Sequence, residues 1–213
     1  QSNGGLIVAI ISNAVTMADA GAFSVGLGSL IHIKTLTASS SATLDFVGGA
    51  SSVVFDNTYP LYKFEFINIH PATNNVTFSF QADTGSNTDY NIAITSSAFR
   101  AQHSEGDDSS VLGYKTAHDQ ANGTAFQHLT QNAQGADNDQ CLCGDLFIFN
   151  PSSSTFVKNF TSRVSNMNEG DLAIDGLVAG YFNTTTALTR VRFKMDSGNI
   201  DAGTIKLYGI KDS

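Results

Sequence analysis

Residues 61–66 read LYKFEF, and this short stretch decides the fold class. Aromatic side chains stand at every second position, and Lys63 and Glu65 stand between them. Successive side chains of a β-strand point to opposite faces of the sheet. The stretch therefore predicts a strand with one face in a hydrophobic core and the other in water.

The same alternation recurs along the chain. It is clearest at residues 76–81 (VTFSFQ) and at residues 190–195 (RVRFKM). Turn-forming Gly, Asn, Asp and Pro clusters separate such segments, at a spacing that predicts about a dozen strands. We expect an all-β protein, an antiparallel β-sandwich of jelly-roll type, forming a single domain over residues 1–213 with residues 1–13 as a candidate N-terminal arm.

Two local expectations are sharper than the rest. Residues 188–194 and 204–210 both read as strands around the turn sequence DSGN at residues 196–199, which predicts a C-terminal hairpin. Residues 146–149 (LFIF) are apolar at every position. They should therefore be buried on both faces or lie at a subunit contact.

Composition limits the partners and the compartment. Only 14% of residues are charged and the net charge is −8, which argues against nucleic acid as a partner. Cys141 and Cys143 are the only cysteines, and we interpret them as free thiols of a protein assembled in a reducing cytosol. The apolar run at residues 6–11 is too short to span a membrane, so no membrane partner is expected.

Several polar clusters could in principle carry chemistry, but each is better explained as turn or surface. Oxygen ligands in loops suit calcium, yet neither acidic cluster matches an established ligand loop. The two cysteines lack the partners of a structural zinc site. The residues considered were His103, Glu105, Asp107, Asp108, Asp137, Asn138, Asp139, Cys141, Cys143, His118 and His128.

We therefore expect no metal, no cofactor and no enzymatic activity. One reservation stays open, because the carboxylate pair of a glycoside hydrolase is brought together by the fold and not by spacing in the sequence.

Three tyrosines near loop-like sequence, Tyr59, Tyr90 and Tyr114, are candidate glycan contacts, since aromatic rings stack on sugar faces. Loop packing or a subunit contact is the alternative. A second set comprises candidate interface residues, which form an apolar N-terminal run and a cationic stripe. They are Leu6, Ile7, Val8, Ile10, Ile11, Arg190, Arg192, Lys194 and Lys206. The stripe could dock an acidic partner or another copy, or it could be a solvated face that discourages edge pairing.

The C-terminal region carries a resemblance. Its segments are FNTTTALTRVRF at residues 182–193, SGNI at 197–200 and GTIKLYGI at 203–210. The Gly-Thr-x-x-Leu-Tyr-Gly-Ile ending is similar to the end of virion proteins of marine tailed bacteriophages. Residues 29–36, 59–71 and 147–158 also resemble that group. The resemblance implies a virion β-sandwich and brings no catalytic residues with it.

Together these observations predict a phage virion structural protein, either a capsid decoration or a tail-fibre or appendage component. It would assemble in the host cytoplasm with other virion proteins and with copies of itself, most simply as a homotrimer. The alternatives are a carbohydrate-binding module for a host surface glycan and a glycan depolymerase.

Overall fold

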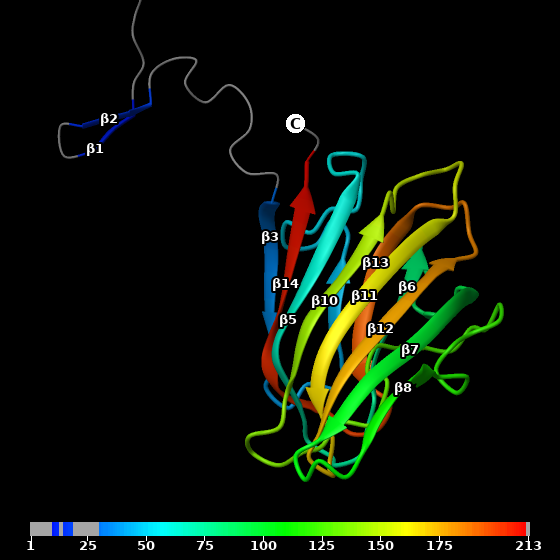
Figure 1. Ribbon diagram of the computed structural model, residues 1–213. Helices are drawn as coiled ribbons and strands as arrows, with labels where there is room; N and C mark the ends of the chain where they lie inside the picture. The colour runs from blue at the N-terminus through cyan, green and yellow to red at the C-terminus, as the bar shows by residue number, and fades with distance from the viewer. Residues whose placement is uncertain (1–9, 13–14, 19–29, 212–213) are drawn as a thin grey trace, which may run out of the picture.

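The computed structural model describes residues 10–12, 15–18 and 30–211 (Figure 1). All regular structure in this part of the chain is β-strand. The strands are β1 (Ile10–Ser12), β2 (Val15–Ala18), β3 (Leu30–Thr37), β4 (Leu44–Val47), β5 (Leu61–Pro71), β6 (Phe78–Thr84), β7 (Ile94–Ser104), β8 (Ser110–Tyr114), β9 (Gln127–His128), β10 (Leu142–Phe149), β11 (Lys158–Met167), β12 (Leu172–Phe182), β13 (Leu188–Met195) and β14 (Ile200–Ile210).

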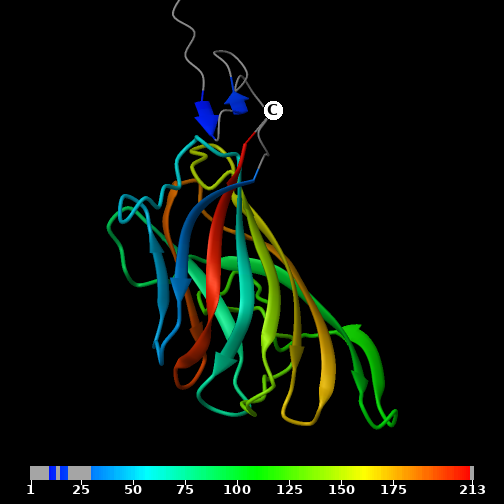
Figure 2. The same ribbon diagram turned by 90° about the vertical axis from the view of Figure 1, so that its left-hand side faces the viewer.

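Two antiparallel sheets build the sandwich. The large sheet has eight strands in the order β3-β14-β5-β10-β11-β12-β7-β8, and the small sheet has four in the order β4-β13-β6-β9. The small sheet lies behind the large one in Figure 1, and in Figure 2 the green β7–β8 hairpin forms one margin of the large sheet. The antiparallel β-sandwich predicted from the sequence is confirmed, whereas its jelly-roll connectivity stays a prediction.

Alternating patterns explain why these segments are strands. β11 alternates buried and exposed side chains over almost its whole length, as an amphipathic strand in a two-layer protein must. The buried sides of both sheets meet in one hydrophobic core. Phe193 of β13 lies at its centre, with its ring 5.1–6.3 Å from five other phenylalanine rings. Those neighbours are Phe46, Phe64, Phe66, Phe78 and Phe80.

The long connection from β8 to β10, residues 115–141, folds against the sandwich and is fixed by buried glutamines. Backbone polar groups that leave water need hydrogen-bond partners, and a carboxamide offers both a donor and an acceptor. Gln127 donates to the carbonyl oxygens of His118 (2.8 Å) and His128 (3.1 Å), and its Oε1 accepts from Ser96 Oγ (2.6 Å). Gln134 donates to Ile69 O at 2.6 Å.

One local expectation was wrong, and one of the two alternatives of a second is excluded. β13 and β14 do not form a hairpin, because β13 belongs to the small sheet and β14 to the large one, so residues 196–199 cross between the layers. Residues 146–149 are not buried on both faces, so a subunit contact stays the prediction for this stretch. Leu146 and Ile148 are buried, but Phe149 lies on the outer face of the large sheet with 39% of its surface exposed.

The predicted N-terminal arm falls mostly outside the described residues, and this includes Leu6, Ile7 and Val8. Ile10 and Ile11 belong to β1, which pairs with β2 in an antiparallel hairpin.

Candidate functional site

The four predicted cationic residues do not form one stripe. Arg190, Arg192 and Lys194 point outward from β13 of the small sheet, whereas Lys206 lies on β14 of the large sheet, opposite Glu65. The expectation relied on a C-terminal hairpin that does not exist. Lys206 is therefore separated from the other three by the thickness of the sandwich.

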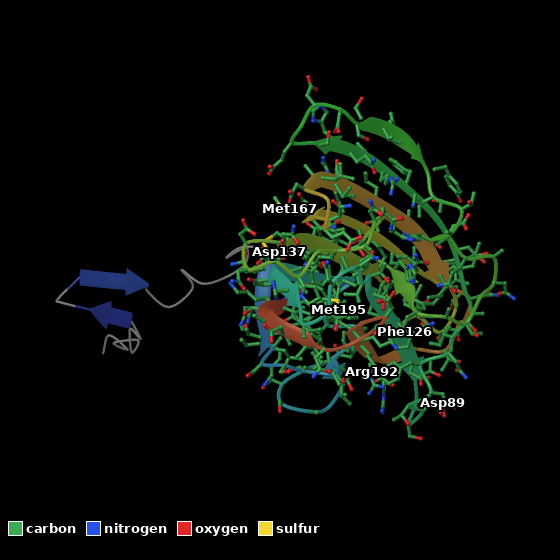
Figure 3. The ribbon with its side chains drawn as sticks, turned by 90° about the horizontal axis from the view of Figure 1, so that it is seen from below. Asp89, Phe126, Asp137, Met167, Arg192 and Met195 are labelled. Atoms are coloured by element: carbon green, nitrogen blue, oxygen red, sulfur yellow. The ribbon has the colours of Figure 1, made fainter. Side chains whose placement is uncertain are left out.

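The cations of β13 are already engaged within the chain. Arg192 makes two hydrogen bonds to the Asp45 carboxylate, and its guanidinium lies 4.0 Å from the centre of the Tyr90 ring. The bonds to Asp45 raise the pKa of Arg192, so the guanidinium stays protonated. Lys194 Nζ lies 4.7 Å from the centre of the Phe126 ring, and Figure 3 labels Arg192 and Phe126 on this side of the molecule. These contacts favour a structural role for the surface.

The three candidate tyrosines differ sharply in exposure. Tyr90 is only 3% exposed, since the loop after β6 folds back on the small sheet and Asp83 accepts the Tyr90 backbone N–H (2.9 Å). Tyr59 packs edge-on against Tyr62 at the margin of the core. Tyr114 is 55% exposed, and its hydroxyl donates to Asp119 Oδ2 at 2.7 Å. Only Tyr114 therefore presents a ring to solvent as expected.

Tyr114 belongs to an exposed apolar group that the sequence analysis did not identify. Phe99 of β7 lies directly opposite Tyr114 of β8, and Leu112 lies two residues away on the same face. The exposed fractions are 42% for Phe99, 80% for Leu112 and 55% for Tyr114. We call these three residues the β7–β8 patch. A contiguous apolar group of this kind at a sheet margin is typical of an interaction surface.

A row of charges crosses the middle of the outer face of the large sheet. Glu65 of β5 lies opposite Asp145 of β10, and Arg163 of β11 holds Asp175 of β12 through two hydrogen bonds (2.9 and 2.8 Å). Burial raises the pKa of Asp145, and Glu65 adds to the rise while Lys63 opposes it. A shallow depression of about 530 Å³ is lined by Asp145, Arg163 and Asp175, among others.

Further toward β7, the same outer face carries hydroxyl and amide side chains around a second depression, whose accessible surface is mainly apolar. Thr95, Ser97, Asn159 and Thr161 surround a depression of about 450 Å³ together with Tyr181. Small polar side chains around an aromatic ring are the chemistry that a sugar requires. This depression is the second surface that sequence reasoning missed, because its residues come from three strands that pair only in the fold.

The two cysteines are free and adjacent, and both lie near one amide. Their Sγ atoms are 3.8 Å (Cys141) and 3.5 Å (Cys143) from Asn68 Oδ1. Burial, followed by the neighbouring Cys143, raises the pKa of Cys141, which disfavours the thiolate that a nucleophile or metal ligand needs. Cys141 and His70 line a hollow of about 390 Å³, and His70 Nε2 is 3.1 Å from Asp137 O.

His118 and His128 pack against each other, with ring centres 4.7 Å apart. Burial and then the neighbouring His128 lower the pKa of His118 to about 4, and burial lowers that of His128. Both rings are therefore neutral at pH 7. They form a partly buried contact within the long connection.

The acidic turn between β7 and β8 is held by its own side chains. Ser104 Oγ donates to Asp108 Oδ1 (2.6 Å) and accepts the backbone N–H of Ser109 (2.9 Å). His103 Nε2 lies 3.2 Å from Asp107 Oδ1. Among the described residues, no group of three or more His, Cys, Asp or Glu side chains is arranged to hold a metal ion.

Comparisons with protein-family models, with curated proteins and with solved structures found no match to this chain. In the described part of the chain, no helix is long and apolar enough to cross a membrane. Among the surfaces described above, the β7–β8 patch departs furthest from an ordinary hydrated surface.

Proposed function

We propose that this protein is a structural component of a bacteriophage particle, a capsid decoration or a tail appendage, that assembles with copies of itself. One observation carries the proposal: the β7–β8 patch exposes Phe99, Leu112 and Tyr114 together at a margin of the large sheet. Burying such side chains between copies would supply the free energy of association. The resemblance of the C-terminal segments to virion proteins supports the location on a particle.

Purified particles give the direct test. An antibody against this chain should label the particle surface at a repeated position, and the chain should be present in many copies per particle. A chain found only in the soluble fraction of infected cells would contradict the proposal.

Glycan binding is a second candidate function, and the depression around Tyr181 favours it. Hydroxyl and amide groups of Thr95, Asn159 and Thr161 could bind sugar hydroxyls while the Tyr181 ring contacts an apolar sugar face. Tyr181→Ala should abolish adsorption to host polysaccharide and leave the particles intact. Tyr59→Phe is the matched control, because Tyr59 packs at the core margin and should leave adsorption unchanged.

The third candidate, a depolymerase, would need an acid and a partner carboxylate. Asp145 and Glu65 are the adjacent pair on the outer face, and the raised pKa of Asp145 suits a proton donor. Lys63 lies within 4 Å of both carboxylates, which gives the pair a structural explanation as well. Release of reducing sugar ends from host polysaccharide, lost in Asp145→Asn, would support this function over the first two.

A further inference from the structure

The two sheets end in four margin strands, and these differ in how well they are protected. An unpaired strand invites pairing with another chain unless charge, proline, a bulge or short length prevents it. β3 carries His32 and Lys34 and has a register shift against β14. β4 is four residues long and carries Asp45, and β9 has two residues. β8, with the sequence SVLGY, has neither charge nor proline.

The hydrogen bonds at both ends of the β7–β8 ladder show which backbone groups of β8 have no partner among the described residues. Ser104 N–H donates to Ser109 O (2.9 Å), and Lys115 N–H donates to Ala98 O (2.8 Å). In an antiparallel pair, residues bonded to the neighbouring strand alternate with residues that direct their N–H and C=O away from it. Residues 109, 111, 113 and 115 therefore face β7. Ser110, Leu112 and Tyr114 present their backbone groups outward.

From this arrangement we infer that β8 pairs with β8 of a second copy, antiparallel, about a two-fold axis through Leu112. The inference rests on the self-assembly in the proposed function and specifies its contact. The axis places Leu112 opposite its own mate and Ser110 opposite Tyr114 of the second copy. All outward groups then find partners, with about six hydrogen bonds in three pairs. The two large sheets become one continuous sheet.

The side chains suit this register. Leu112, the most exposed residue of the patch, would cover Leu112 of the second copy on the outer face. Tyr114 would lie beside the small Ser110 of the second copy. On the other face, the exposed Val111 would lie opposite Gly113, which leaves room for it. A two-fold contact requires such self-complementarity, since the same surface must serve both copies.

The register also predicts the stoichiometry. A closed two-fold contact gives dimers and not the homotrimer expected from the sequence. Five residues per strand make a small interface, so the dimer should dissociate on dilution.

Sedimentation equilibrium from micromolar to millimolar protein tests the contact. The wild-type chain should shift from monomer to dimer, and Leu112→Lys should weaken the dimer by about tenfold or more, because it places two like charges directly opposite each other. Ile31→Lys is the matched control: it adds the same charge at an exposed apolar position of β3, the opposite margin, and should leave the dimer unchanged. Circular dichroism confirms that each variant is folded.

Disulfide trapping tests the register. In a Cys141→Ser, Cys143→Ser background, Leu112→Cys should form an intermolecular disulfide on mild oxidation, because directly opposed strand residues lie within bridging range. Ser110→Cys should not, since four residues of strand separate it from its mate. A monomer at millimolar protein, or crosslinking of Ser110→Cys but not Leu112→Cys, would overturn the inference. A stable trimer would overturn it too, but would leave the proposed function standing.

Discussion

Arg192 of β13 donates two hydrogen bonds to the Asp45 carboxylate of β4, Nε to Oδ1 at 2.8 Å and Nη2 to Oδ2 at 2.6 Å. The pair joins two strands of the small sheet while Tyr90 lies beneath the guanidinium. A lysine side chain can make neither the two parallel hydrogen bonds to Asp45 nor the planar stacking on the Tyr90 ring. Arg192→Lys should therefore lower the free energy of unfolding by about 1–2 kcal/mol, as measured by urea titration.

Arg163 provides a control of the same chemistry. It also makes two hydrogen bonds to a carboxylate, Asp175, but its side chain is 69% exposed against 28% for Arg192. Exposed pairs contribute little, so Arg163→Lys should leave the urea midpoint close to that of the wild type. Equal losses in both variants would show that the Tyr90 contact and partial burial are unimportant.

Phe193 should be among the most sensitive core positions. Its ring contacts five phenylalanines from both sheets, so truncation would leave a cavity that neither sheet can fill alone. Phe193→Ala should cost about 3–5 kcal/mol in thermal or urea unfolding. Phe156→Ala removes a ring that is 67% exposed and should stay within about 0.5 kcal/mol of wild type.

Acid should weaken the protein through the two packed histidines. Both have pKa values below the usual value in the folded state, His118 at about 4, whereas in the unfolded chain they would titrate near 6.5. Between these values the unfolded state binds more protons, so stability is complete above about pH 6.5 and falls as the pH drops toward 4.

Urea midpoints at pH 7.5 and pH 5 measure this loss. His118→Phe should make the difference between the two midpoints smaller. The exposed His103→Asn is the control and should keep the full difference. An unchanged difference in His118→Phe would place the acid sensitivity elsewhere.

Gln127 should hold the long connection in place. Gln127→Ala removes hydrogen bonds to two carbonyl groups and to Ser96 Oγ, leaving buried groups without partners. We expect a loss of about 1–3 kcal/mol and faster amide hydrogen exchange over residues 115–130. Thr116→Ala, at an exposed position of the same connection, should change neither quantity. Unaltered exchange in Gln127→Ala would show that packing alone fixes this segment.

The fold class was predictable because most strands show period-two alternation, as β5, β11 and β13 do. Sheet membership was not. The turn at residues 196–199 has the chemistry of a hairpin loop, yet the two strands it joins lie in different layers. Local turn chemistry fixes where the chain changes direction, whereas long-range packing decides which strand it meets.

The candidate surfaces were likewise predictable from local sequence only in part, because long-range packing decides which side chains are exposed. The exposure of Tyr114 was predicted from its loop-like neighbours. Tyr90 has similar neighbours but is buried, because its backbone bonds Asp83 and its ring packs against Arg192 of the small sheet. Phe99 and Leu112 gave no signal, because an apolar residue at a strand position looks like core in a sequence. Only the position of β8 at the margin of the sheet reveals that nothing in the described chain covers them.

The glutamines under the long connection have a consequence for the conditions that the protein can tolerate. A carboxamide neither gains nor loses a proton over the ordinary pH range, and its bonds to carbonyl oxygens are weakened little by dissolved ions. The glutamine hydrogen bonds that hold residues 115–141 against the sandwich should therefore persist from low to high salt concentration. The paired imidazoles within it, His118 and His128, would respond to an acidic environment.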